Sequence, residues 1–213
     1  MSDLEPADDD LARYPDQATA TLHAWSRGDL RHDAASTPIR YVLTPDGRPA
    51  AAVSSDMLQA VDCALAIPEE GEAQLELSVT LREFEPLGGG ESNSDRWKIY
   101  HGTPPHPLWA MFDIDMARFR GAILDGEAVV RPNPLAAVEP RLCGLLNREY
   151  APRVLTTIQS QLGISPEKPR VVGVGATGLD VRNRFDVVRL DFPAPITDPA
   201  IAERAILDWI SPA

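Results

Sequence analysis

Alternation of apolar and polar residues is the feature that most restricts what this chain can fold into. Between Gln74 and Glu83, every second position is apolar: Leu75, Leu77, Val79 and Leu81. Because successive side chains of a strand point to opposite faces, this pattern predicts a strand with one buried side and one solvent-facing side. Such one-sided strands are typical of antiparallel sheets that cover a core on one face.

Two further segments indicate strands. The runs 39–44 and 49–54 flank Pro45-Asp46-Gly47-Arg48, and the Asp-Gly pair favours a tight hairpin turn because glycine adopts positive φ without cost. The run 108–123 again has strand character. Four of its residues are predicted to line a core: Trp109, Met111, Phe112 and Ile114.

Helical spacing of apolar residues, together with prolines, glycines and capping residues, divides the rest of the chain into elements. Helices are predicted over 16–25, from Ser55 through Leu65, as a single turn near 96–100, as two helices within 135–162, and over 199–209; two β runs are predicted over 170–181 and 185–192. The Arg131-Pro132-Asn133-Pro134 stretch predicts a boundary. We therefore expect an α+β protein with an acidic flexible tail (1–14), a β-barrel domain (15–131) and a C-terminal helix-hairpin-helix domain (132–213).

Charge limits the classes of partner. The formal net charge is −12 and the sequence pI about 4.7, so nucleic acids and anionic lipid surfaces are not expected to bind. The acidic first ten residues lack the pattern of a secretory signal, and no apolar run reaches the roughly 20 residues that a membrane-spanning helix needs. The sequence therefore predicts a cytoplasmic protein.

A glycine pattern in the C-terminal part could suggest a dinucleotide site. Gly173, Gly175 and Gly178 have the spacing of the dinucleotide-binding fingerprint. That fingerprint requires a helix starting at its last glycine, whereas the residues that follow, Leu179-Asp180-Val181-Arg182, continue in extended alternation. We therefore interpret the glycines as part of closely packed strands.

The order of elements and four local motifs resemble the HugZ-like haem-utilisation family. Those proteins join an FMN-binding split barrel, of the pyridoxamine-phosphate-oxidase type, to a small C-terminal domain. The resemblance rests on 40–49 with 53–56, 115–121, 174–182 and 188–198. It implies an antiparallel split barrel, a homodimer, and haem or, less favoured, FMN as cofactor.

This chain departs from the family at the residues that usually hold cofactors. Leu145-Leu146-Asn147-Arg148-Glu149-Tyr150 stands where the family has a His-Met-Asn-x-Asp-His pattern, no histidine follows His106, and 57–60 lacks the basic residue of the flavin phosphate site. The first barrel hairpin of the family is also not visible in 31–37, which predicts a barrel that is incomplete or closed by a partner. The resemblance thus implies a member without the usual ligands.

Six residues remain as candidates for a cofactor site. His101 and His106 share a proline-rich loop and are the candidate axial ligands of a haem iron, although exposed loop histidines are common. The candidate apolar contacts are Tyr41, Trp97, Tyr100 and Trp109. The sequence predicts a protein that binds haem, another tetrapyrrole or a protein partner in a cleft where the barrel and the C-terminal domain meet. Two alternatives stay open: an FMN-dependent oxidoreductase of the same fold, and a regulatory adaptor that binds no cofactor.

Overall fold

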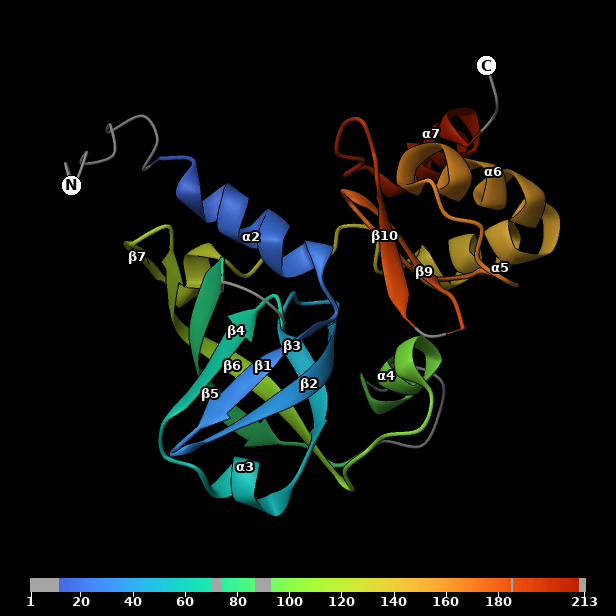
Figure 1. Ribbon diagram of the computed structural model, residues 1–213. Helices are drawn as coiled ribbons and strands as arrows, with labels where there is room; N and C mark the ends of the chain where they lie inside the picture. Colours follow the sequence, from blue (N-terminus) through green and yellow to red (C-terminus); the bar gives the residue numbers. More distant parts are fainter. Residues whose placement is uncertain (1–11, 70–73, 87–92, 185, 211–213) are drawn as a thin grey trace. The chain divides into compact units, whose positions relative to one another are not determined.

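The computed structural model describes residues 12–69, 74–86, 93–184 and 186–210 (Figure 1). They form two compact units. The barrel unit contains residues up to Lys98 together with Gly102–Pro132, and the C-terminal unit contains Ile99–His101 and the residues from Asn133 onward. Each unit is described by itself. Most of the predicted acidic tail (1–14) lies outside the described residues, and its flexibility stays a prediction.

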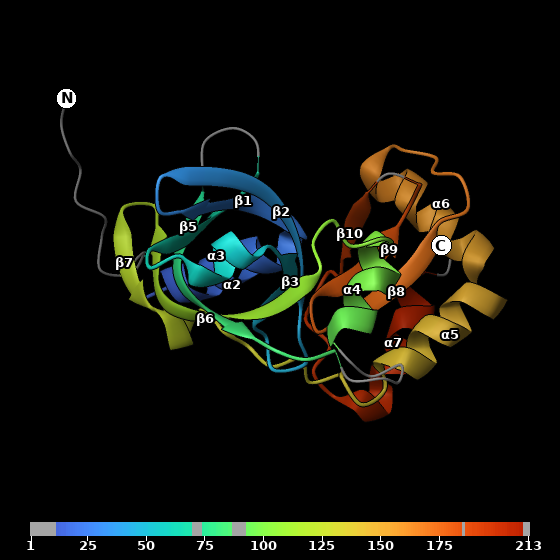
Figure 2. The same cartoon turned by 90° about the horizontal axis from the view of Figure 1, so that it is seen from below.

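Six antiparallel strands form a closed barrel. They are β1 (Arg27–His32), β2 (Ala35–Leu43), β3 (Pro49–Val53), β4 (Cys63–Ile67), β5 (Leu75–Glu83) and β6 (Leu108–Phe119). The strand order is β3-β2-β1-β4-β5-β6, and the pairing of β3 with β6 closes the ring (Figure 2). A seventh strand, β7 (Ala122–Asp125), pairs with β6 outside the ring. The predicted antiparallel barrel is confirmed.

The expectation of an incomplete or partner-closed barrel is wrong. Arg27–His32 and Ala35–Leu43 form the missing hairpin, with His32 opposite Ala35. Asp33 supplies the positive φ of this turn, at 48°, and Ala34 follows it, so the turn lacks the glycine of the Asp-Gly signal. In β1 only Gly28 and Leu30 are buried, so the strand carries too little apolar alternation to be recognised.

The predicted alternation in β5 places its apolar side in the barrel core. Leu75, Leu77 and Val79 are buried, and the residues between them are not. From β6 the core receives Phe112 and Ile114. Burial of these side chains is the main stabilising contribution to the unit, because each removes a large apolar surface from water.

Helices lie at both ends of the barrel. In Figure 1, α2 (Tyr14–Ala24) lies across one end and α3 (Ser55–Gln59) at the other. The first helix begins before the predicted cap Asp16 and ends before Gly28, which is in β1. The second is shorter than predicted, because Leu65 belongs to β4. The predicted single turn near 96–100 is a full helix, α4 (Asn93–His101).

The C-terminal unit is a three-stranded antiparallel sheet with helices. The strands β8 (Arg170–Gly175), β9 (Gly178–Arg182) and β10 (Val187–Asp191) follow in order, and the helices are α5 (Glu139–Glu149), α6 (Ala151–Leu162) and α7 (Pro199–Trp209). The predicted helix ends are confirmed, since Gly163 has a φ of 67° and Asp198 accepts a hydrogen bond from the Ala200 N–H.

Gly173, Gly175 and Gly178 lie on a β-hairpin. This agrees with their interpretation as glycines of closely packed strands. The predicted single run 170–181 is two strands, with Ala176 and Thr177 in the turn between them. A Cβ at Gly173 would overlap the Tyr100 hydroxyl, and one at Gly178 would overlap the Leu190 carbonyl oxygen. Close packing therefore accounts for these two glycines. None of the helices in the described residues is long and apolar enough to cross a membrane.

Candidate functional site

The aromatic candidates of the barrel unit are buried. Tyr41 is completely buried and its hydroxyl donates a hydrogen bond of 3.1 Å to the Leu22 carbonyl oxygen. The indole N–H of Trp97 donates to the Arg40 carbonyl oxygen at 2.7 Å. The rings of Trp97 and Trp109 meet edge to face, with centroids 5.8 Å apart. In this structure these side chains join barrel elements, and a ligand would contact them only after local rearrangement.

Tyr100 belongs to a polar cluster of the C-terminal unit. Its hydroxyl donates to Asp180 Oδ2 at 2.9 Å, and Arg189 donates to Asp180 Oδ1 at 2.8 Å and to the Thr177 hydroxyl at 2.6 Å. The Arg189 side chain is only 9% exposed, so its charge depends on these partners. Sequence reasoning missed this pair. The signal was the hairpin register, which sets Arg189 directly opposite Asp180.

The two candidate iron ligands fall in different units. His101, at the end of α4, belongs to the C-terminal unit, and its ring centroid lies 5.9 Å from that of Tyr100. His106 belongs to the barrel unit, in the loop before β6. Both are half-buried. Their role as axial ligands stays a prediction. Among the described residues, no group of three or more His, Cys, Asp or Glu side chains could hold a metal ion.

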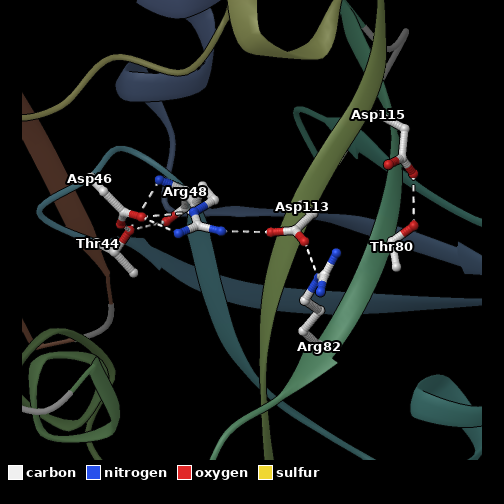
Figure 3. Close-up of polar contacts among 7 residues, drawn as sticks. All are labelled: Thr44, Asp46, Arg48, Thr80, Arg82, Asp113 and Asp115. Atoms are coloured by element: carbon white, nitrogen blue, oxygen red, sulfur yellow. Dashed lines mark hydrogen bonds and ion pairs between the residues drawn. The ribbon is translucent and has the colours of Figure 1, made fainter.

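An ion-pair network fastens the β2–β3 hairpin to β6. Arg48 donates to Asp46 Oδ2 at 2.7 Å and to Asp113 Oδ1 at 2.8 Å, and Asp113 also pairs with Arg82 (Figure 3). Asp113 is therefore largely covered, at 21% exposed, while Asp115 stays exposed and accepts from Thr80. These contacts join the β2–β3 turn to β6, and β6 to β5.

The network shifts the ionisation of two of its members. Burial raises the pKa of Asp46, but hydrogen bonds from Thr44 and Arg48 and the positive charge of Arg48 outweigh it, so the pKa lies below its ordinary value of 3.8. Hydrogen bonds to Asp46 and Asp113 raise the pKa of Arg48 above its ordinary value. Both groups are therefore held in their charged forms at neutral pH.

A hollow of the barrel unit lies beside α2. Its volume is about 890 Å³. Ten residues line it, from α2, the segments next to β4 and β5, and the β6–β7 hairpin: Gln17, Ala20, Thr21, Pro68, Gln74, Glu76, Arg118, Phe119, Arg120 and Gly121. All ten belong to the barrel unit. We call this hollow the α2 cavity.

The α2 cavity contains polar groups whose bonding is incomplete. Arg118 and Arg120 form no ion pair within the described part of the chain, whereas Glu76 pairs with Arg31 at 3.0 Å. The Oε1 atom of Gln17 is buried and has no hydrogen-bond partner among the described residues. Buried polar atoms are normally satisfied, so an unsatisfied one needs an explanation, and a bound molecule or water is one.

Sequence reasoning did not identify the α2 cavity. In the sequence, 115–121 is notable only as a motif of the family resemblance, and none of the residues that line the cavity is a candidate for a cofactor site. His106 is also far from it, because Leu108 and Arg118 lie near opposite ends of the 12-residue strand β6 and His106 precedes Leu108. At about 3.3 Å per residue, His106 and Arg118 are too far apart along the strand to contact the same small molecule.

Comparisons with known proteins give the fold. No protein-family model and no curated protein matches the sequence. The chain is similar in structure to Atu2129, a protein of unknown function from Agrobacterium tumefaciens str. C58, with a TM-score of 0.70, 14% identity and coverage of 99% of this chain and 100% of that chain. A heme binding protein from Mycobacterium smegmatis matches with a TM-score of 0.45 and 16% identity over 97% of both chains. At these identities the likeness concerns the fold.

Proposed function

We propose that this chain is a binding protein that holds a small organic ligand in the α2 cavity, and that the ligand is a tetrapyrrole. The cavity carries the proposal. Its volume of about 890 Å³ falls within the range of roughly 300–1,000 Å³ that is usual for small-molecule sites. Phe119, Pro68 and Ala20 supply apolar contacts, and polar side chains surround them.

The choice of a tetrapyrrole rests on the sequence resemblance to haem-utilisation proteins, because cavity volume alone does not select a ligand. In the α2 cavity such a ligand would be held by its ring faces and side groups. None of the lining residues is a histidine, cysteine, methionine or tyrosine, which are the usual axial ligands of haem iron. Binding is therefore expected to be independent of iron.

Titration of the full chain with haemin and with iron-free protoporphyrin IX tests this proposal. We expect both to bind with similar affinity. Ala20→Trp, which fills the cavity from the exposed side of α2, should weaken both at least tenfold, while Ala24→Trp on the same helix, outside the cavity lining, should not. Equal binding by both tryptophan variants would contradict the proposal.

The same titration decides between the proposal and its rivals. If haemin alone binds and its absorption shift is lost in His101→Ala or His106→Ala, the histidines are iron ligands and the cavity proposal fails. If FMN binds and neither porphyrin does, the flavin-dependent oxidoreductase is favoured. If none of the three binds, the adaptor without a cofactor is favoured. Each outcome selects one function.

We also propose that the protein forms a homodimer, as the family resemblance implies. Sedimentation velocity of the full chain over a tenfold concentration range would test this proposal directly. A single species with the mass of one 23.2 kDa chain at all concentrations would contradict it.

A further inference from the structure

Two arginines line the α2 cavity. Arg118 is the next-to-last residue of β6, and Arg120 begins the turn to β7. Phe119, between them, is buried at 3% exposure and points into the barrel core. Because side chains alternate across a strand, Arg118 points to the face opposite that of Phe119. The cavity lining thus brings together two side chains that carry guanidinium groups.

The turn itself fixes the direction of Arg120. Arg120 and Gly121 are the two central residues of the β6–β7 hairpin, and both have positive φ, 51° and 83°. Asn, Asp or Gly is usual at the first of these positions, so an arginine there is uncommon. In this conformation the Arg120 guanidinium lies 5.2 Å from the centre of the Phe119 ring. A stacked guanidinium keeps its N–H groups free to donate in its own plane.

Arg118 and Arg120 have no carboxylate partner among the described residues of a protein rich in carboxylates. The chain has 32 Asp and Glu residues against 20 Lys and Arg, yet within the described residues no carboxylate lies at ion-pair distance from Arg118 or Arg120. The nearby carboxylate of Glu76, opposite Arg118 in the strand register, is bound to Arg31. An anion entering the cavity would therefore find two guanidinium groups available.

We infer that the α2 cavity recognises the anionic group of its ligand, a carboxylate or a phosphate, through Arg118 and Arg120. This inference rests on the proposed function, since it assigns the chemistry of the same site. The guanidinium fork matches the geometry of both anions and can bind each through two parallel hydrogen bonds. Gln17, whose Oε1 atom is buried without a hydrogen-bond partner among the described residues, lines the same cavity.

The test follows backbone amide signals of the full chain by NMR during titration with citrate and, separately, with inorganic pyrophosphate. We expect saturable shifts at Gly121 and Gln74, which line the cavity. Arg118→Gln and Arg120→Gln should each weaken binding about tenfold, because each removes a charge-assisted interaction. Arg204→Gln is the matched control, since it removes the same charge from a 90% exposed side chain of α7. Tighter binding of citrate assigns a carboxylate, and tighter binding of pyrophosphate a phosphate.

Two results separate this inference from the proposed function. Protoporphyrin that binds as tightly as its uncharged dimethyl ester, with no effect of Arg118→Gln or Arg120→Gln, overturns the anion site and leaves a tetrapyrrole in the cavity. Saturable anion binding that depends on both arginines, with no porphyrin binding, retains the anion site and removes the tetrapyrrole. Absence of saturable shifts with either anion also overturns the inference.

Discussion

Gln17 has a buried side-chain oxygen without a hydrogen-bond partner among the described residues, and we expect this oxygen to destabilise the ligand-free protein. A buried acceptor without a partner destabilises the folded state by about 1–3 kcal/mol. In the structure this acceptor is Oε1 of Gln17, at the α2 cavity. Such an atom needs an explanation, and a ligand bound in the cavity would supply one.

Gln17→Leu is therefore predicted to raise the free energy of unfolding of the ligand-free protein, by about 1 kcal/mol, and to weaken ligand binding. Urea denaturation measures the first effect and titration the second. Gln74→Leu is the control, because Gln74 also lines the cavity but its side chain is exposed, so stability should change little. A loss of stability in Gln17→Leu would show that the amide has a structural partner.

Asp46 gives the ion-pair network a predictable dependence on pH. Its pKa in the folded protein lies below the ordinary value of 3.8, so the charged form stabilises the fold above that pH, and the contribution is lost as the pH falls through the folded-state pKa. Because 47% of the side chain is exposed, solvent screening limits the effect to less than about 1 kcal/mol.

We predict that Asp46→Asn is less stable than the wild type at pH 7 and that the difference disappears as the pH falls through the lowered pKa of Asp46. Chemical denaturation at a series of pH values measures this difference. Asp16→Asn is the control, because Asp16 is 86% exposed and its pair with Arg131 is long, at 3.8 Å. A difference that stays constant down to acidic pH would mean that the charge of Asp46 is not what the network uses.

At the scale of elements, the β8–β9 hairpin depends on glycine at position 173, where there is no room for a side chain. Gly173 lets the Tyr100 hydroxyl approach the hairpin backbone and reach Asp180. A methyl group at this position would overlap that hydroxyl and would lie 2.8 Å from Asp180 Oδ2. Overpacking of this kind usually costs about 1–3 kcal/mol.

Gly173→Ala is predicted to destabilise the protein by about 2 kcal/mol. In a Tyr100→Phe background the same substitution should cost less, because the overlapping oxygen is gone, and a double-mutant cycle measures the coupling. Gly144→Ala is the control, since its added Cβ would meet only Arg148, at 3.8 Å, and helix propensity should make it neutral or stabilising. Additive effects of Gly173→Ala and Tyr100→Phe would contradict the proposed overlap.

The elements that could be predicted from sequence are those with local signals. The turn residues Asp46-Gly47 predict the β2–β3 hairpin, and the capping residue Asp198 with Pro199 predicts the start of α7. Sequence reasoning missed the β1–β2 hairpin because its turn, Asp33-Ala34, lacks the glycine of the Asp-Gly signal. Leu65 was placed in a helix because its spacing from Val61 fits a helix as well as the strand that tertiary pairing selects.

The α2 cavity could not be predicted for a different reason. Its lining comes from segments far apart in the chain, between Gln17 and Gly121, and only closure of the barrel brings them together. The aromatic candidates have side chains that could contact a cofactor. Large aromatic side chains more often fill a core, as those of Tyr41 and Trp97 do here.

At the scale of the whole molecule, each unit has a hydrophobic core of its own. One cluster joins α2 to the barrel strands, and the other joins the C-terminal helices to β8, β9 and β10. Units with separate cores are expected to fold separately. The two units are therefore expected to contribute separable functions.

A chain shortened to end at Pro132 is predicted to unfold cooperatively and to bind the ligand of the α2 cavity within about threefold of the full chain, because all lining residues are present. Calorimetry and the porphyrin or anion titration measure the two properties. The complementary fragment from Asn133 lacks Tyr100, so it should be less stable than the same region in the full chain. A cooperative Pro132 fragment that does not bind would show that the cavity needs the C-terminal unit.

Closure of the barrel by β3 and β6 has a consequence for synthesis on the ribosome. The ladder pairs Val53 with Leu108 and Ala50 with Met111, so the ring stays open until the chain has been made well past β5. During that interval β3 and β5 have bare edges, which are templates for pairing with other chains. Release of the β6 segment removes both edges in one event, so the nascent chain is most prone to aggregate just before residue 119 emerges.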